Sequence, residues 1–195
     1  TPDRLLNIFE ACKPFGTEDM FVEFTSTSKI SFPGAGVSAI AASDNNLKAI
    51  KARLAMQTIS YDKMNQLRHV KYFKNLDGIT AHKKKHAAII APKFAIVLEA
   101  LENELKENDL ARWTKPNGGY FISLDTQQCS AMRVGELCKS LGVVLTSVGA
   151  TYPYGKDPED KNIRIAPTFP SVTDIGKAAE VLCLCIKLAT IEKMM

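Results

Sequence analysis

Apolar positions recur along the chain with two different spacings, and the pattern predicts a mixed order of strands and helices. Short runs of alternating or continuous apolar residues, bounded by Gly, Ser or Pro, predict strands. These runs are residues 19–26, 36–43, 120–125, 143–149 and 162–167, the second of them expected to be buried. Apolar residues spaced three and four apart predict helices. These helical runs are residues 2–13, 43–60, 76–108, 132–142 and 171–195.

Polar residues and glycine at the ends of these runs predict where the helices begin and end. Pro2 and Asp3 suit the start of the first helix. Ser43 and Ser171 precede helical runs, and their hydroxyls can accept hydrogen bonds from the first free N–H groups. Asp174 extends the second of these ends to a capping box, and Gly142 suits a helix C-terminus. Within the longest run, Pro92 is expected to kink the helix or to fall at a break.

The order of the elements predicts an α/β fold class in two parts. Residues 1–75 are expected to form a piece of a three-layer α/β domain. Residues 76–195 are expected to form a long linking helix followed by a smaller α+β domain. With 195 residues, of which 46% are hydrophobic, the chain can bury one sizeable core, or one core and a smaller annex.

Composition and charge exclude several classes of protein. The net charge is +4, from 25 basic and 21 acidic residues spread along the sequence, so no nucleic acid partner is expected. The five cysteines are an odd number without a C-x-x-C spacing, which favours a reducing, cytoplasmic compartment. Charged residues and Pro92 interrupt the most apolar stretch, residues 86–105, so no membrane segment is expected.

Four short motifs follow one another across nearly the whole chain. They are STSK at 26–29, PGAG at 33–36, PNGGYF at 116–121 and NIRIAPTFPS at 162–171. In this order they resemble the C-terminal half of a pyridoxal-phosphate-dependent aminotransferase of fold type I, the aspartate aminotransferase superfamily. The wording SKISFPGAG is most similar to a MocR-type or aspartate aminotransferase subgroup. A strand-end lysine by itself is usually a solvated charge, but the ordered set of motifs favours a chemical role for Lys29.

The resemblance implies that Lys29 bonds covalently to the aldehyde of pyridoxal 5'-phosphate and then moves protons at the substrate's α-carbon. Such chemistry needs a primary amine at a strand end that can be neutral and nucleophilic. Ser26 matches the family's phosphate-binding serine. Ser28 and the backbone around Gly34 and Gly36 are further candidates for the phosphate. Most relatives place a phosphate-binding arginine seven or eight residues after the lysine, where this chain has glycine and valine. Either another cation replaces it, or the backbone amides around Gly34 and Gly36 take a larger share.

The resemblance also implies residues that bind the substrate. Arg164 matches the arginine that holds the substrate α-carboxylate through two parallel hydrogen bonds. Tyr152, in a loop rich in Tyr, Pro and Gly, is a candidate pocket wall or a simple loop anchor, and so is its neighbour Tyr154. Asn65 and Arg68 lie in the segment that reaches the neighbouring subunit's active site in relatives. They could read a distal carboxylate across a homodimer interface, or be ordinary surface residues.

The same resemblance implies that the chain is about half an enzyme. The family's residues on the cofactor ring lie upstream of the lysine, where only a short helix and strand are expected here. The isolated chain is therefore expected to be inactive. The expected function is amino-group transfer between an amino acid, expected to be aspartate, and a 2-oxo acid. The alternatives are an effector domain of a GntR/MocR-type transcriptional regulator and a non-catalytic fragment. No metal is expected, because His82 and His86 have the spacing of a metal pair but no third ligand.

Overall fold

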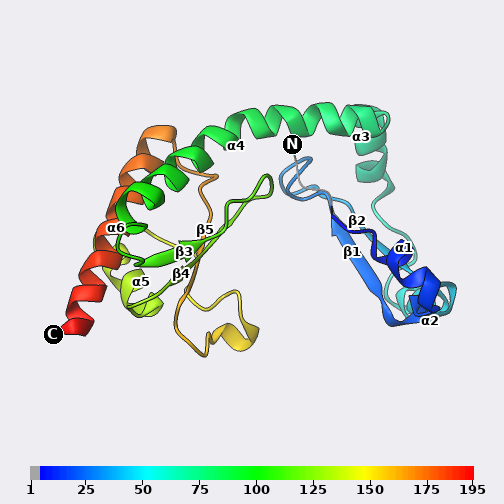
Figure 1. Cartoon of the computed structure of the whole chain (residues 1–195). Helices are drawn as coiled ribbons and strands as arrows, with labels where there is room; N and C mark the ends of the chain where they lie inside the picture. Colours follow the sequence, from blue (N-terminus) through cyan, green and yellow to red (C-terminus); the bar gives the residue numbers. More distant parts are fainter. Residues whose placement is uncertain (1–4) are drawn as a thin grey trace. The chain divides into compact units, whose positions relative to one another are not determined.

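The structure is a computed structural model that describes residues 5–195 (Figure 1). The predictions made for Pro2 and Asp3 lie outside these residues. The described chain has a mixed α/β fold and divides into two compact units, residues 5–86 and residues 87–195. Each unit is described by itself below. The two-domain division expected at residue 75 stays a prediction about the whole protein.

The N-terminal unit contains a small antiparallel sheet followed by helices. Three short helical segments come first: α1 (Ile8–Cys12), η1 (Lys13–Phe15) and η2 (Glu18–Met20). The predicted helix at 2–13 is therefore shorter in its described part, because Asn7 caps α1 by accepting from the N–H of Glu10 at 3.3 Å. Strands β1 (Val22–Ser26) and β2 (Ser38–Ala42) pair antiparallel in the register Ser26 opposite Ser38.

Both strands form where the sequence predicts them, but the expectation that the second is buried is wrong. Residues of β1 and β2 are exposed almost throughout. The reason is that the sheet has two strands only, and no other described strand pairs with it. Among the exposed side chains are Val22, Phe24 and Ile40, which are apolar.

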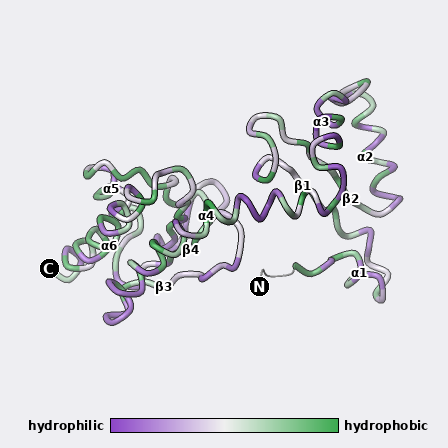
Figure 2. The backbone as a smooth tube through the Cα atoms, turned by 90° about the horizontal axis from the view of Figure 1, so that it is seen from above, coloured by the Kyte–Doolittle hydropathy of each residue, from purple (hydrophilic) through white to green (hydrophobic). Residues whose placement is uncertain are grey.

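Three helices follow the sheet. Helix α2 (Asp44–Gln57) begins after Ser43, whose hydroxyl accepts from the N–H of Asn46 at 3.3 Å, as the sequence predicts. Helix α3 (Lys63–Phe73) was not predicted; Asp62 caps it. Helix α4 (Leu76–Leu105) confirms the long predicted helix, and it continues through Pro92 without a break. Hydrophilic and hydrophobic stretches alternate along α4 (Figure 2).

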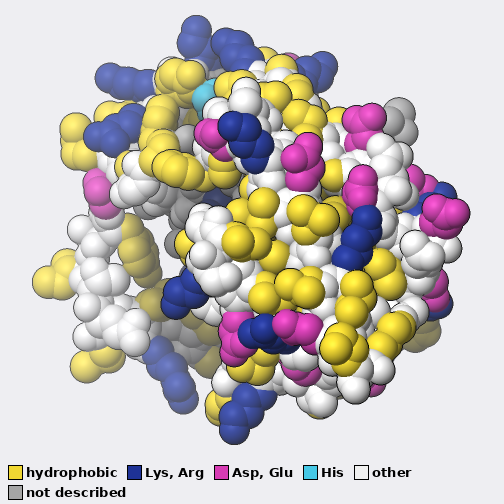
Figure 3. Space-filling model, turned by 90° about the vertical axis from the view of Figure 1, so that its left-hand side faces the viewer, with side chains coloured by type: hydrophobic (Ala, Val, Ile, Leu, Met, Phe, Trp, Pro, Cys, Tyr) yellow, Lys and Arg dark blue, Asp and Glu magenta, His cyan; other side chains and the backbone are white. Residues whose placement is uncertain are grey.

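The C-terminal unit packs helices on a three-stranded sheet. Strands β3 (Ala111–Trp113), β4 (Ile122–Thr126) and β5 (Asn162–Ile165) lie in that order and pair antiparallel. Helices α5 (Ala131–Ser140) and α6 (Val172–Met194) complete it, together with the short η3 (Pro153–Gly155). The core contains side chains from α4, α5, α6 and the three strands, and its large members include Leu101, Leu105, Ile122, Leu124, Ile163 and Ile186. At the end of the unit facing the viewer in Figure 3, hydrophobic, acidic and basic side chains are interspersed.

The strand predicted at residues 143–149 is not formed. Its neighbours β3, β4 and β5 pair with one another, and this segment has no strand partner among the described residues. The N–H of Val143 instead donates to the carbonyl of Cys138 at the end of α5. Val143, Leu145 and Val148 pack against the core as partly buried side chains. The apolar run therefore reflects burial at the side of the core rather than sheet pairing.

Candidate active site

Lys29 lies in the middle of a tight turn that begins one residue after β1. The carbonyl of Thr27 accepts hydrogen bonds from the N–H groups of Ile30 at 2.9 Å and Ser31 at 2.8 Å. These bonds close the backbone around Ser28 and Lys29, and the side chain of Lys29 is exposed in this chain. The turn fixes the point from which the lysine side chain extends.

Two serine hydroxyls lie at the base of this turn. The hydroxyl oxygens of Ser26 and Ser28 are 2.7 Å apart, and the N–H of Ser28 donates to the Ser26 hydroxyl at 3.2 Å. Both residues are exposed. Hydroxyl and backbone N–H donors gathered in a turn are suited to binding an anion such as phosphate.

The glycine loop after the turn needs glycine at two positions for different reasons. Gly34 has a φ of +74°, which residues with a side chain rarely adopt. Gly36 packs directly on Ser28: a Cβ atom at this position would lie 2.4 Å from the Ser28 hydroxyl and 3.0 Å from its backbone N and Cα. The loop thus approaches Ser28 so closely that it leaves no room for a side chain.

Helix α3 holds the glycine loop from the other side. The side-chain amide of Asn65 donates to the carbonyls of Ala35 at 2.9 Å and Gly36 at 3.3 Å. The side-chain oxygen Oδ1 of Asn65 is buried and has no hydrogen-bond partner. Arg68, three residues along the helix, is exposed. The structure therefore assigns the Asn65 amide a contact with the loop, while a substrate contact of Asn65 or Arg68 stays a prediction.

Sequence reasoning missed three residues beside the lysine. The hydroxyls of Thr27 and Ser31 both lie within hydrogen-bond distance of the ring nitrogen Nε2 of His69, which is on α3. The only local signal was the density of hydroxyl residues around the lysine. Nothing in the sequence indicated that His69, 38 residues beyond Ser31, would lie against them.

A second group of candidate residues lies in the C-terminal unit around Arg164. This residue is on β5, directly opposite Ser123 of β4. Its guanidinium carbon lies 4.7 Å from the centroid of the Phe121 ring, within the range of a cation–π interaction. Its Nε atom is buried without a hydrogen-bond partner. Phe121 belongs to the PNGGYF motif, but the sequence did not indicate its contact with Arg164.

Arg164 also lines a cavity of about 450 Å³. The walls are the irregular segment 141–146, the residues after β5, and one face of α6 that includes Asp174 and Lys177. No carboxylate lies within ion-pair distance of Arg164 in the part of the chain that the structure describes. A half-buried guanidinium beside a cavity is suited to binding a carboxylate through two hydrogen bonds.

The loop that contains Tyr152 is held by a polar network. The Asp157 carboxylate accepts from the N–H groups of Glu159, Lys161 and Asn162. The pKa of Tyr152 is raised, mainly by the negative charge of Asp157 and next by burial. Within the described chain, Tyr152 is not among the residues that line the cavity at Arg164. Its role as a pocket wall stays a prediction.

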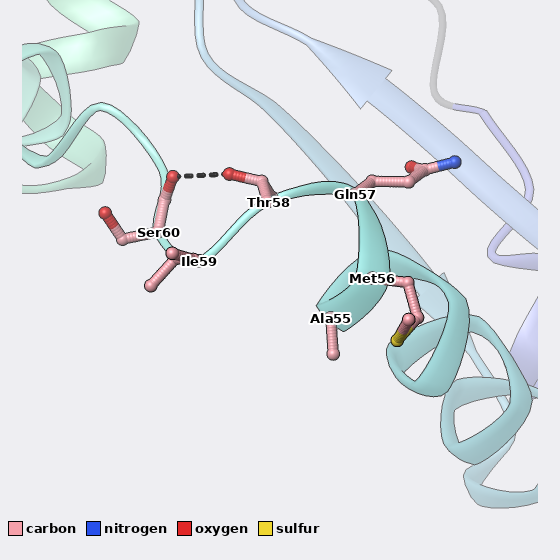
Figure 4. Close-up of a pocket in the computed structure, with 6 residues that line it drawn as sticks. All are labelled: Ala55, Met56, Gln57, Thr58, Ile59 and Ser60. Carbon is pink, nitrogen blue, oxygen red and sulfur yellow. Dashed lines mark hydrogen bonds between the residues drawn. The ribbon is translucent and has the colours of Figure 1, made fainter.

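Two further features are a hollow at the end of α2 and a pair of histidines on α4. A shallow hollow at the end of α2 is formed by Ala55–Ser60, whose side chains point in different directions around the bond from the Thr58 hydroxyl to the Ser60 carbonyl (Figure 4).

The ring centroids of His82 and His86 lie 4.4 Å apart on α4. Burial, together with the charges of His86 and Lys85, lowers the pKa of His82. No group of three metal-binding side chains occurs within residues 5–195.

The candidate residues thus form two groups, each described within its own unit. Lys29, Ser26, Ser28 and the two glycines belong to the N-terminal unit, together with Asn65 and Arg68. Arg164 and Tyr152 belong to the C-terminal unit. The first group offers an amine beside anion-binding donors. The second offers a guanidinium beside a cavity.

Comparison with known proteins shows which proteins the chain is similar to. The family model described as aspartate amino-transferase matches residues 1–195. An aspartate aminotransferase of Corynebacterium glutamicum is 45% identical over 177 residues, which cover 91% of this chain and 41% of that protein. No helix of residues 5–195 has the length and apolar character needed to cross a membrane.

Solved structures agree with this match. The crystal structure of an aspartate transaminase from Corynebacterium glutamicum has a TM-score of 0.91 at 43% identity, covering 97% of this chain and 45% of that one. The α-aminoadipate aminotransferase LysN of Thermus thermophilus, solved with N-(5'-phosphopyridoxyl)-L-leucine, has a TM-score of 0.79 at 19% identity and shows the same fold. The match to LysN covers 98% of this chain and 48% of LysN. The chain therefore spans less than half the length of each of these relatives.

Proposed function

Because this chain belongs to the aspartate amino-transferase family, we propose that it is the C-terminal part of a pyridoxal-phosphate-dependent aminotransferase of fold type I. The observation that carries the proposal is the position of Lys29, in the middle of a hydrogen-bonded turn beside two serine hydroxyls. The effector-domain alternative is less well supported, since the relative of 45% identity is named for its enzymatic activity.

The residues around Lys29 fit pyridoxal phosphate. Ser26 and Ser28 supply hydroxyl donors for the phosphate group, and the N–H groups of the glycine loop can add to them. Because Gly36 has no side chain, the space beside the Ser28 hydroxyl that a Cβ atom would occupy stays open. In the absence of the family's nearby arginine, we assign a larger share of the phosphate contacts to these hydroxyl and backbone donors.

In this proposal, Lys29 does two things. Its amine would hold the cofactor by condensing with the aldehyde carbon, with loss of water. After the substrate's amine has displaced it from that carbon, the free lysine amine would accept the proton that leaves the substrate's α-carbon. When bound, pyridoxal phosphate supplies an electron sink that stabilises negative charge at that carbon. The turn around Lys29 restricts where the amine can reach, which is what a proton-transferring group requires.

Arg164 orients the substrate in the same proposal. Its planar guanidinium binds the α-carboxylate of the amino acid and of the 2-oxo acid product through two parallel hydrogen bonds. Phe121 supports the guanidinium from one face. We further propose that the preferred amino acid is aspartate, and that Arg68 and Asn65 contribute to its distal carboxylate in a homodimer. Tyr152 is proposed as part of the pocket wall.

The five cysteines, all free and buried, support our expectation of a reducing, cytoplasmic compartment. The chain spans less than half the length of the relatives that it matches. For that reason the tests below use the protein expressed from its complete gene.

The direct test is amino-group transfer from aspartate to 2-oxoglutarate by that protein with added pyridoxal phosphate. We expect glutamate to form, and we expect Lys29→Arg to abolish its formation, because a guanidinium cannot replace the nucleophilic amine. The control is Lys48→Arg on the exposed surface of α2, which should leave the rate unchanged. Glutamate formation by the Lys29→Arg variant at the wild-type rate would contradict the proposal.

A further inference from the structure

His69 is placed so that it contacts the chain on both sides of Lys29. Its Nε2 atom lies 2.7 Å from the hydroxyl oxygen of Ser31, two residues after the lysine. The same atom lies 3.2 Å from the hydroxyl oxygen of Thr27, two residues before it. Ser31 is buried, with 8% of its surface exposed, and His69 is half-buried.

The proton positions follow from the partner of the other ring nitrogen. The Nδ1 atom of His69 lies 2.9 Å from the carbonyl oxygen of Asn65, which can only accept a hydrogen bond. Nδ1 therefore donates, and in the neutral ring Nε2 is left as an acceptor. Nε2 can then accept the proton of one hydroxyl, that of Ser31 or that of Thr27. The Ser31 hydroxyl oxygen also lies 3.0 Å from the Thr27 carbonyl oxygen and 2.9 Å from the Thr27 hydroxyl oxygen. Hydrogen bonds on both ring nitrogens fix the orientation of the ring.

The contact reaches beyond the turn to the whole loop between β1 and β2. Thr27 is bonded to Val37 twice, because its N–H donates to the Val37 carbonyl and its hydroxyl accepts from the Val37 N–H, both at 2.8 Å. The ring of Phe32 meets the His69 ring edge to face, with centroids 5.1 Å apart. One turn earlier on α3, Asn65 holds the glycine part of the same loop. Helix α3 thus serves as a support for the loop that contains Lys29.

We propose that His69 is a positioning residue for Lys29, which holds the turn through Ser31 and Thr27 so that the amine is presented in one place. The inference rests on the proposed function of Lys29. The hydrogen bonds of His69 lie within this chain and can be tested without the cofactor. His69 does not touch the reacting atoms in this account. Its effect on the chemistry passes through the two hydroxyl residues.

A pair of substitutions separates this role from a general need for a side chain at position 69. His69→Gln keeps an acceptor oxygen at about the reach of Nε2, whereas His69→Asn presents the same amide one methylene shorter and cannot reach Ser31. Gln66→Asn, at an exposed position of α3, is the matched control for the shorter amide. Ser31→Ala removes the hydroxyl nearest to Nε2 without changing the helix.

The first measurement is hydrogen exchange of the Ile30 and Ser31 amides in the complete protein without cofactor. We expect His69→Asn and Ser31→Ala to accelerate this exchange about tenfold, as for the loss of one hydrogen bond, with His69→Gln and Gln66→Asn within about twofold of wild type. Equal exchange in His69→Asn and His69→Gln would overturn the proposal. So would acceleration of the α2 amides to the same extent, since this would mean general unfolding.

The second measurement is the rate at which the visible absorption of bound pyridoxal phosphate develops after the cofactor is added. We expect His69→Asn to slow this rate about tenfold and His69→Gln to keep it near the wild-type value, because the two variants differ only in how far the acceptor reaches. An unchanged rate in His69→Asn would overturn the positioning role. If the wild-type protein developed no absorption, the proposed function would fail, while the exchange data would still decide whether His69 holds the turn.

Discussion

The guanidinium of Arg164 lies against the face of the Phe121 ring, with a distance of 4.7 Å from its central carbon to the ring centroid. The ring restricts the orientation of the guanidinium but accepts none of its N–H groups, so two of these groups can still donate to a carboxylate. We predict that Phe121→Leu raises the dissociation constant of a substrate carboxylate about two- to fivefold, the equivalent of a partly exposed cation–π contact. Titration with a dicarboxylate inhibitor such as maleate measures this, with the exposed Phe15→Leu as control. Equal affinity in both variants would show that the ring does not orient Arg164.

Arg68 provides a test of substrate choice. A lost charged contact in a desolvated site costs about 2–5 kcal/mol, so Arg68→Ala should lower kcat/KM for aspartate by at least about 30-fold and barely change it for alanine. Arg164→Lys should lower kcat/KM for both amino acids, since the two-bond geometry at the α-carboxylate is lost while the charge stays. Equal losses for aspartate and alanine in Arg68→Ala would mean that Arg68 does not read the distal carboxylate.

The two glycines of the loop should respond differently to alanine. At Gly36 the added Cβ would lie 2.4 Å from the Ser28 hydroxyl, so Gly36→Ala should displace Ser28 and weaken pyridoxal phosphate binding about tenfold. At Gly34 no atom lies within 4 Å of an added Cβ, but the φ of +74° is unfavourable for alanine. Gly34→Ala should therefore cost about 1–2 kcal/mol of unfolding free energy and leave the bound cofactor's affinity nearly unchanged. Binding titrations and urea unfolding of the two variants give the comparison, and a reversed order of cofactor affinities would contradict it.

Cys183 predicts how stability changes at alkaline pH. Burial raises the pKa of its thiol from 9.0 to about 12 in the folded protein. Between these two values the unfolded chain has lost the proton and the folded chain still holds it. The contribution of Cys183 is therefore complete below pH 9, and it is lost as the pH rises toward 12.

The wild-type free energy of unfolding should fall more steeply over this interval than that of Cys183→Ala, by up to about 1.4 kcal/mol per pH unit. Urea unfolding at several pH values compares the two slopes. Parallel curves for the two proteins would show that the thiol does not titrate differently in the folded and unfolded states. The substitution itself shifts the whole curve, so the slopes and not the absolute values decide.

Local signals were sufficient for much of the fold. Serine caps before α2 and α6, the apolar periodicity of α4, and the runs that became β1, β2, β4 and β5 depend on residues close together in the sequence. The strand prediction for residues 143–149 was wrong because an apolar pattern reports burial, whereas a strand also needs a pairing partner, and this segment pairs with no described strand. Pro92 lies inside α4 and does not end it, so this proline does not mark an element boundary.

The sequence predicted the candidate site only at residues that lie in the family's motifs. Lys29 and Arg164 could be singled out because each lies in a motif of the family. His69 and Phe121 could not be assigned their contacts. The first depends on where α3 places residue 69 against Ser31, and the second on the pairing that sets β4 beside β5. Such pairings are tertiary, and a single sequence does not contain them explicitly.

The central claim is that Lys29 bonds to the cofactor, and peptide mapping after reduction tests it directly. The protein expressed from its complete gene is incubated with pyridoxal phosphate, reduced with borohydride, digested and analysed by mass spectrometry. The account predicts a phosphopyridoxyl group on Lys29, with no such label when Lys29 is replaced by Arg. A label confined to any other lysine, with Lys29 unmodified, would contradict it.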